Sequence, residues 1–122
     1  MPISHQVDPT RQLVLSIATG VLTAREIIDG QRALRKAAGF RSDLDQVLDV
    51  SRVTEVAFSE EDVFMIVANG PFGAGARRVL VIPAALQASH LGLIAALIRE
   101  AGVAFRVVET EAEAFRWLEG SR

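Results

Sequence analysis

Apolar residues along the chain follow two different spacings, one typical of strands and the other of helices. Five short segments are continuously apolar or alternate with polar residues, and turn residues bound them. We expect these strands at residues 3–7, 13–18, 44–50, 78–82 and 103–108. Longer segments with apolar residues three and four positions apart predict helices. We expect these helices at residues 24–38, 60–69 and 83–101, and from residue 111 onward.

Hydroxyl residues mark the N-termini of three of these helices. Thr23 and Thr110 each precede a glutamate by three positions, which is the spacing of a capping box. Ser59 precedes three acidic residues, which the helix dipole favours in a first turn. Residues 47–63 therefore predict a strand that ends at Asp49, a loop, and a helix that begins at Ser59.

The predicted elements follow the order β-β-α-β-α-β-α-β-α. Strands that alternate with helices of this length imply right-handed crossovers and a parallel sheet. Only a turn at Asp8-Pro9-Thr10 separates the first two strands, so they should form a hairpin at or near one edge. We expect a single α/β domain over residues 1–122, with helices packed on a mixed, mostly parallel five-stranded sheet.

Composition and charge argue against several classes of function. The net charge is −2, whereas a nucleic-acid-binding domain usually presents a basic face. The chain has no cysteine, which excludes disulfides and thiolate chemistry. His5 and His90 lie far apart and neither has ligand spacing, so we expect no metal and no cofactor. Because neither a signal peptide nor a long apolar run is present, we expect a cytoplasmic protein of bacterial type.

Two polar residues stand where α/β proteins often place function. Asp49 lies at the carboxyl end of a predicted strand, and Ser59 begins the following helix. The Ser59 hydroxyl could cap the helix, or it could carry a phosphate that its three acidic neighbours would repel. No spacing of nucleophile and base accompanies Asp49, Ser59 or His5. We therefore expect that the protein is not an enzyme and that Ser59 is primarily a cap.

The helix over residues 60–69 is apolar almost all round, and two interpretations remain open. One is deep burial. The other is an exposed surface for a partner or a second copy of the chain, formed by Met65, Phe64 and Leu93. Separately, Phe58, Phe64 and Phe72 could line an apolar pocket for a small ligand.

Several short motifs occur in the order seen in one known family. They are Gly20–Thr23 before the first helix, Phe40 after it, Leu48–Ser51 (LDVS) before the serine-capped helix, Arg77-Arg78 at the fourth strand, and Glu113–Leu118 near the end. With these motifs, nearly the whole chain resembles the STAS domain of anti-sigma-factor antagonists. It is most similar to the small bacterial STAS/CRAL-TRIO-like proteins.

The resemblance implies a STAS fold that acts through protein partners. In anti-sigma-factor antagonists, a partner kinase phosphorylates the hydroxyl at the N-terminus of the second helix, and Ser59 is the matching position. This chain departs from the family's Asp-Ser-Ser-Gly stretch, because Phe58-Ser59-Glu60-Glu61 takes its place. The CRAL-TRIO likeness implies a small apolar ligand.

Together these observations predict a non-catalytic interaction or regulatory module that contacts a protein partner or forms a homodimer. The second and third helices would supply its contact surface. The alternative is a carrier for a small apolar ligand or lipid, which would depend on an internal pocket instead.

Overall fold

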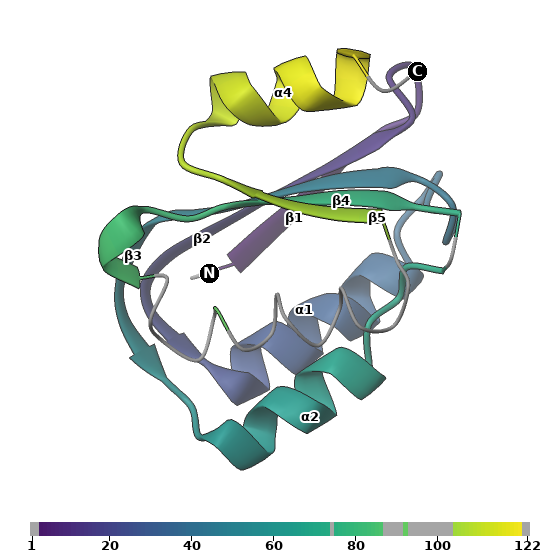
Figure 1. Ribbon diagram of the computed structural model, residues 1–122. Coiled ribbons are helices and arrows are strands. Elements are labelled where there is room, and N and C mark those ends of the chain that lie inside the picture. The colour runs from purple at the N-terminus through teal and green to yellow at the C-terminus, as the bar shows by residue number, and fades with distance from the viewer. Residues whose placement is uncertain (1–2, 74, 87–91, 93–103, 121–122) are drawn as a thin grey trace.

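The computed structural model describes residues 3–73, 75–86, 92 and 104–120 (Figure 1). Five strands form one sheet in the order of the chain. They are β1 (Ile3–Asp8), β2 (Leu13–Thr23), β3 (Asp45–Ala57), β4 (Arg77–Val81) and β5 (Ala104–Val108). β1 pairs antiparallel with β2, and the other neighbours pair in parallel. The predicted mixed, mostly parallel sheet is confirmed, with the opening hairpin at one edge.

Helices cover both faces of the sheet (Figure 1). α1 (Ala24–Arg35) and α2 (Glu60–Ala68) lie on one face, and α4 (Glu111–Gly120) lies on the other. We call these the α1/α2 face and the α4 face. A short 3₁₀ helix, η1 (Ala84–Leu86), follows β4. Most of the helix predicted over residues 83–101 lies outside the described residues.

The predicted caps form at the start of the described helices. Thr23 Oγ1 accepts a hydrogen bond from the backbone nitrogen of Glu26 at 3.3 Å and donates one to its carboxylate at 2.8 Å. Thr110 and Glu113 repeat both contacts at the start of α4, each at 3.2 Å. These bonds satisfy backbone donors that a helix leaves free in its first turn, so each helix begins where the sequence predicts.

β2 and β3 are much longer than predicted, and the loop expected after Asp49 does not form. The two strands stay paired as far as Thr23 and Ala57. The pairing passes two register irregularities, and Gly20 beside one of them has a φ of +68°. Most residues of β3 beyond Val50 are exposed, so their polar side chains resemble those of a loop. β3 therefore ends at Ala57, only two residues before α2 begins at Glu60.

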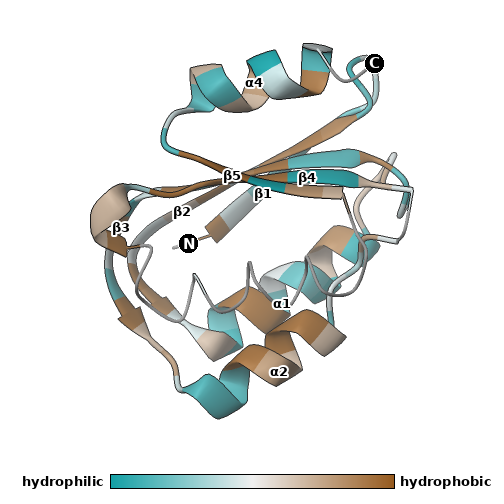
Figure 2. Cartoon of the chain, in the orientation of Figure 1, coloured by the Kyte–Doolittle hydropathy of each residue, from teal (hydrophilic) through white to brown (hydrophobic). Residues whose placement is uncertain are grey.

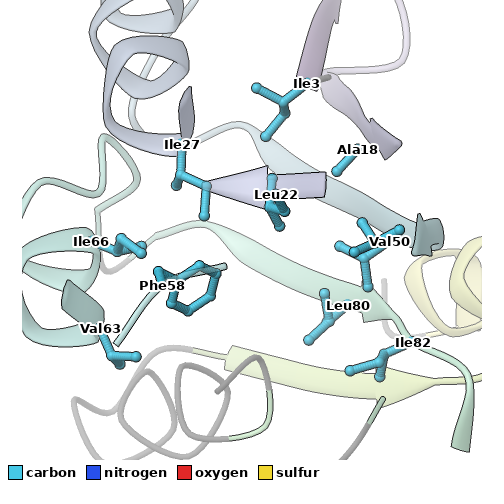
Figure 3. Packing of buried hydrophobic residues seen from close by; sticks show 11 residues of the cluster. Ile3, Ala18, Leu22, Ile27, Val50, Phe58, Val63, Ile66, Leu80 and Ile82 are labelled. Atoms are coloured by element: carbon cyan, nitrogen blue, oxygen red, sulfur yellow. The ribbon is translucent and has the colours of Figure 1, made fainter. Parts of the chain in front are cut away.

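Apolar clusters hold the helices to both faces. On the α1/α2 face, Phe58, Val63 and Ile66 pack with Leu22 and Ile27 (Figure 3). The buried residues of the α4 face are Leu13, Val47, Val79, Val81, Val108, Ala114 and Leu118. Each large side chain that is fully buried contributes about 1.5–3 kcal/mol, so these clusters fix the positions of α2 and α4 on the sheet.

Candidate functional site

The end of β3 places Ser59 as the N-cap of α2. Ser59 Oγ accepts a hydrogen bond from the backbone nitrogen of Asp62 at 3.2 Å, and Asp62 Oδ2 accepts one from the backbone nitrogen of Ser59 at 2.9 Å. Ser59 is exposed, as are Glu60 and Glu61. Ser59 is therefore engaged in a reciprocal capping box with acidic neighbours.

Helix α2 buries one side and presents large apolar side chains on the other. Val63 and Ile66 are buried, whereas Phe64 is 58% exposed and Met65 is 57% exposed. Hydrophobic colour covers most of α2 beyond its acidic first turn (Figure 2). We call Phe64 and Met65 the α2 surface pair. Leu93, which was predicted to share this surface, lies outside the described residues.

The three phenylalanines predicted to line one pocket lie in three different environments. Phe58 is buried in the core, whereas Phe64 is exposed on α2. Phe72 packs edge to face against Phe40, with ring centroids 5.5 Å apart. Phe64 is thus exposed on the helix, away from the core that contains Phe58. Of the three, Phe72 alone borders the hollow described below.

A row of polar side chains crosses the sheet on the α1/α2 face. His5, Ser16, Gln46 and Arg78 come from β1, β2, β3 and β4 in turn, and we call them the polar stripe. Arg78 Nε and Nη2 donate to Gln46 Oε1 at 3.0 and 2.9 Å. Gln46 Nε2 donates to Ser16 Oγ at 3.0 Å. Ser16 Oγ lies 2.6 Å from His5 Nδ1, which completes a hydrogen-bonded chain across four strands.

The hydrogen bonds of the stripe run in one direction from Arg78 to Ser16. A guanidinium can only donate, so Gln46 must turn its oxygen to Arg78 and its nitrogen to Ser16. The Ser16 hydroxyl accepts that N–H and keeps its own hydrogen and a second lone pair for other partners. The direction of its bond with His5 Nδ1 depends on the tautomer of the imidazole. Burial lowers the pKa of His5, which favours its neutral form.

Two buried polar atoms near His5 lack partners among the described residues. They are His5 Nε2 and Gln31 Oε1. Gly30 allows α1 to lie close over His5, because a Cβ at this position would be 3.1 Å from Nε2. The amide nitrogen of Gln31 donates to the carbonyl oxygen of Ile66 at 3.0 Å and so links α1 to α2. An unpaired buried donor or acceptor costs about 1–3 kcal/mol, so polar atoms left in this way mark a place that a ligand or water would favour.

Arg78 at the opposite end of the stripe is a partly buried cation with a neutral partner. Burial lowers the pKa of Arg78 to about 10, so the guanidinium stays charged near neutral pH. Its central carbon lies 4.9 Å from the centroid of the Phe72 ring. Within the part of the chain that the structure describes, no carboxylate forms an ion pair with Arg78. Among the described residues, the positive charge therefore contacts an amide oxygen and an aromatic face.

The polar stripe borders an apolar hollow between the sheet and the helices α1 and α2. Its cavity volume is about 70 Å³. His5, Gln46 and Arg78 form polar parts of its wall. The apolar parts come from strands and helices alike, and include Ile27, Leu48, Val50, Ile66, Leu80 and Phe105. A mostly apolar concave space with a few converging polar groups is typical of small-molecule sites.

Asp49 lies on the α4 face, where the structure pairs it with Glu111 at the start of α4. Asp49 is buried and accepts a hydrogen bond from the backbone nitrogen of Ser51 at 2.8 Å. Burial opposes its ionisation, but hydrogen bonds from Glu111 and Ser51 and the charge of Arg52 outweigh burial and lower the pKa of Asp49. The hydrogen bond with Asp49 is the main cause that raises the pKa of Glu111. The two carboxyl groups thus favour sharing one proton.

Two further searches covered the described residues. No group of three or more His, Cys, Asp or Glu side chains among them is arranged to hold a metal ion. No helix within the described ranges is long and apolar enough to cross a membrane.

Comparison with solved structures shows the predicted fold. The chain is similar to the anti-sigma factor antagonist SpoIIAA in its unphosphorylated form, which has the STAS fold, with a TM-score of 0.54 and 13% sequence identity. The similarity covers 97% of this chain and 98% of that chain. No protein-family model and no curated protein matches the sequence. The STAS-like fold is confirmed, and at this identity the comparison establishes the fold alone.

The polar stripe was missed by reasoning from the sequence. His5 was considered only as a metal ligand or base, and Arg78 only as a strand start. One signal was available: Ser16, Gln46 and Arg78 each place a polar side chain inside or at the start of an otherwise apolar strand. The strand register places Gln46 opposite Arg78, but it places Ser16 opposite Leu48. The side-chain hydrogen bond between Gln46 and Ser16 was needed to show that these residues form one chain.

Proposed function

We propose that the protein is a non-catalytic regulatory module that binds another protein through the surface of α2. The single observation that carries this proposal is the α2 surface pair, because Phe64 and Met65 are large, apolar, adjacent and more than half exposed. The shared fold with an anti-sigma factor antagonist supports the same role. The sequence prediction of a cytoplasmic protein is compatible with it.

The surroundings of the α2 surface pair indicate the chemistry of its partner. Glu60 and Glu61 are exposed in the first turn of the same helix. An interface typically has an apolar centre and a polar rim, and complementary charge at the rim favours the correct partner. We therefore expect a partner, or a second copy of the chain, that offers an apolar groove with basic residues beside it.

The polar groups that could support catalysis already have structural roles. The Ser59 hydroxyl caps α2, and the Asp49 carboxylate is held by Ser51 and Glu111. Each would have to give up these bonds to act as a nucleophile or a base. This arrangement supports a binding role over a catalytic one.

Substitution at Met65 tests the interaction surface. We expect Met65→Glu to weaken partner capture and self-association at least tenfold, because it places a charge in the centre of the apolar contact. Ala112→Glu on α4 is the matched control, since it adds the same charge to an exposed helix position on the opposite face. Quantitative capture from the native host and light scattering measure the two effects, and circular dichroism confirms folding. Equal capture and equal mass for wild type and Met65→Glu would contradict the proposal.

Substitution at Ser59 tests its role as a cap. We expect Ser59→Ala to lower the free energy of unfolding by about 1 kcal/mol, because the backbone nitrogen of Asp62 loses its acceptor. Ser59→Asp should retain most of the stability, since aspartate also caps helices. Denaturant unfolding measures both variants. Equal losses in the two variants would contradict the capping role.

A second candidate function is a carrier for a small apolar ligand, and we infer it from the hollow on the α1/α2 face. Most of the wall is apolar, and the space lies between elements that the core holds in place. Native mass spectrometry of freshly purified protein should detect a bound small molecule. A mass that matches the free chain under several expression conditions would count against this function.

A further inference from the structure

The positive charge of Arg78 at the wall of the hollow has no carboxylate partner among the described residues. A guanidinium has five N–H donors, and Gln46 Oε1 receives bonds from only two of its nitrogens. A buried charge without a partner costs several kcal/mol, and proteins usually pair it or bind an ion. The carboxylate of a ligand would supply the missing charge, and its two oxygens match the planar donors of arginine.

The wall that the sheet forms beside Arg78 changes from polar to apolar within two residues along the strands. Gln46 lies opposite Arg78 in the register, and Leu48 lies opposite Leu80 two residues further on. Two residues along a strand span about 6.6 Å. Val50 continues the same face of β3 and also borders the hollow. A ligand with a charged head and an apolar body, lying along the strands, would meet both kinds of wall in the right order.

We propose that this hollow binds a small amphiphilic monocarboxylate, with its carboxylate on Arg78 and its apolar body over Leu48 and Leu80. The proposal rests on the second candidate function, the apolar-ligand carrier, and adds the charge and orientation of the ligand. One negative charge suffices, because Arg78 supplies one positive charge, and burial favours the neutral form of His5 at the other end of the polar stripe. A phosphate dianion would bring a second charge for which the described lining offers no further cation.

The size of the hollow limits the ligand. The volume of the hollow, about 70 Å³, is the space open to the centre of a water-sized sphere. One water molecule needs roughly 10–15 Å³ of such space, so the hollow corresponds to about five or six waters. This space suits a slender chain better than a fused ring system. Octanoate is therefore the probe we choose, and octan-1-ol is its uncharged counterpart with the same chain.

The test compares the two probes by titration calorimetry on the full chain. We expect octanoate to bind with a dissociation constant below about 1 mM and octan-1-ol to bind at least tenfold more weakly. Gln46→Glu should remove this preference, because it offers Arg78 an internal carboxylate of the same shape. Arg78→Met should also remove it, and the two variants reach the same result by different changes. Thus a folding defect in one variant does not leave the proposal untested.

Two further variants locate the binding. Ala18→Val adds volume to the wall of the hollow and should weaken both probes at least tenfold, whereas Phe64→Ser on the outside of α2 should weaken neither. Carboxyl-labelled octanoate observed by NMR should show a bound carboxylate with a pKa below its free value. Thermal unfolding of each variant confirms that the comparison is made between folded proteins.

The possible outcomes separate the head group from the carrier. A preference for octanoate that disappears in Gln46→Glu and Arg78→Met supports the proposal. Equal binding of octanoate and octan-1-ol, weakened by Ala18→Val, overturns the carboxylate site but leaves the apolar carrier in place. If neither probe binds wild type, the carboxylate site and the carrier function of this hollow both fail. An octanoate preference that survives both variants overturns the assignment to Arg78.

Discussion

Arg77 and Arg78 are neighbours in β4, yet they face opposite sides of the sheet and meet different partners. On the α4 face, Arg77 Nε and Nη2 hold the two carboxylate oxygens of Asp45, and Nη1 donates to the carbonyl oxygen of Leu118. On the α1/α2 face, Arg78 holds the amide oxygen of Gln46. Asp45 and Gln46 are themselves neighbours in β3, so the two pairs differ by one carboxylate.

This difference separates a structural face from one suited to binding. The Arg77–Asp45 pair balances its charges and ties β3 and β4 to the end of α4, so it leaves nothing for a ligand to neutralise. The Arg78–Gln46 pair keeps a full positive charge beside an apolar hollow. Two arginines that are adjacent in the sequence therefore have different roles, and their partners on β3 decide which role each has.

The largest expected effect comes from replacing the two arginines in turn. We expect Arg77→Met to lower the free energy of unfolding by about 3–5 kcal/mol, because it removes the guanidinium that balances the charge of the buried Asp45 carboxylate. Arg78→Met should cost less than about 1.5 kcal/mol. It leaves the Gln46 oxygen unpaired, but it also removes a partly buried charge without a carboxylate partner among the described residues. Urea unfolding of both variants at pH 7 measures the difference.

Equal losses from the two substitutions would break the comparison. That result would mean that the amide oxygen of Gln46 compensates the charge of Arg78 as well as a carboxylate does. Arg106→Met is a suitable control, because Arg106 is an exposed arginine in the neighbouring strand β5. Its loss should change the free energy of unfolding by less than about 0.5 kcal/mol.

The fold could be predicted because its signals are local. Strand runs, helical spacing and the caps at Thr23, Ser59 and Thr110 each depend on residues a few positions apart. The length of β2 and β3 could not be predicted in the same way. Their last residues have one solvated side, and only the pairing of Leu22 with Val56 and its neighbours shows that they are strands. Register across the sheet is a tertiary property that spacing alone does not contain.

The same distinction between local signals and tertiary pairing applies to the candidate site. The sequence left open whether the helix with Phe64 and Met65 is deeply buried or offers an exposed surface, and both side chains are exposed. The polar stripe required Ser16 and Gln46 to be brought together across 30 positions, and no local pattern does this. The partnership of Asp49 with Glu111 spans an even longer separation and was likewise missed. Sites built across strands therefore depend on the register, whereas sites on one helix do not.

The second prediction concerns acid and the neutral histidine of the polar stripe. Burial lowers the pKa of His5 in the folded chain, so below about pH 6.5 the unfolded chain takes up a proton before the folded chain does. The free energy of unfolding should therefore fall as pH falls from 6.5, with a slope of at most about 1.4 kcal/mol per pH unit from this residue. His5→Gln keeps an acceptor for Ser16 but cannot titrate, so its stability should be flatter between pH 5 and pH 6.5. If the free energy of unfolding depends on pH in the same way in wild type and in His5→Gln, then the polar stripe tolerates a charged His5.

The smallest expected effect is on the α4 face, at the shared proton of Asp49 and Glu111. The raised pKa of Glu111 adds stability that is present below its unfolded pKa and is lost as pH rises through its folded pKa. The lowered pKa of Asp49 acts in the opposite sense, since its contribution is lost as pH falls through its folded pKa. Glu111→Gln keeps a hydrogen-bond donor for Asp49 without the second charge.

We therefore expect Glu111→Gln to be more stable than wild type by about 0.5 kcal/mol at pH 7, since Glu111 is partly exposed and solvent screens its repulsion from Asp49. The difference should vanish near pH 4, where wild-type Glu111 holds its own proton. Glu109→Gln, an exposed residue just before α4, is the matched control and should show no such gain. The midpoints of urea unfolding at pH 7 and pH 4 measure the difference in stability between Glu111→Gln and wild type. A gain at pH 4 as large as that at pH 7 would mean that the carboxyl pair does not share a proton, and the α4 face would then lose one of its two compensated charge sites.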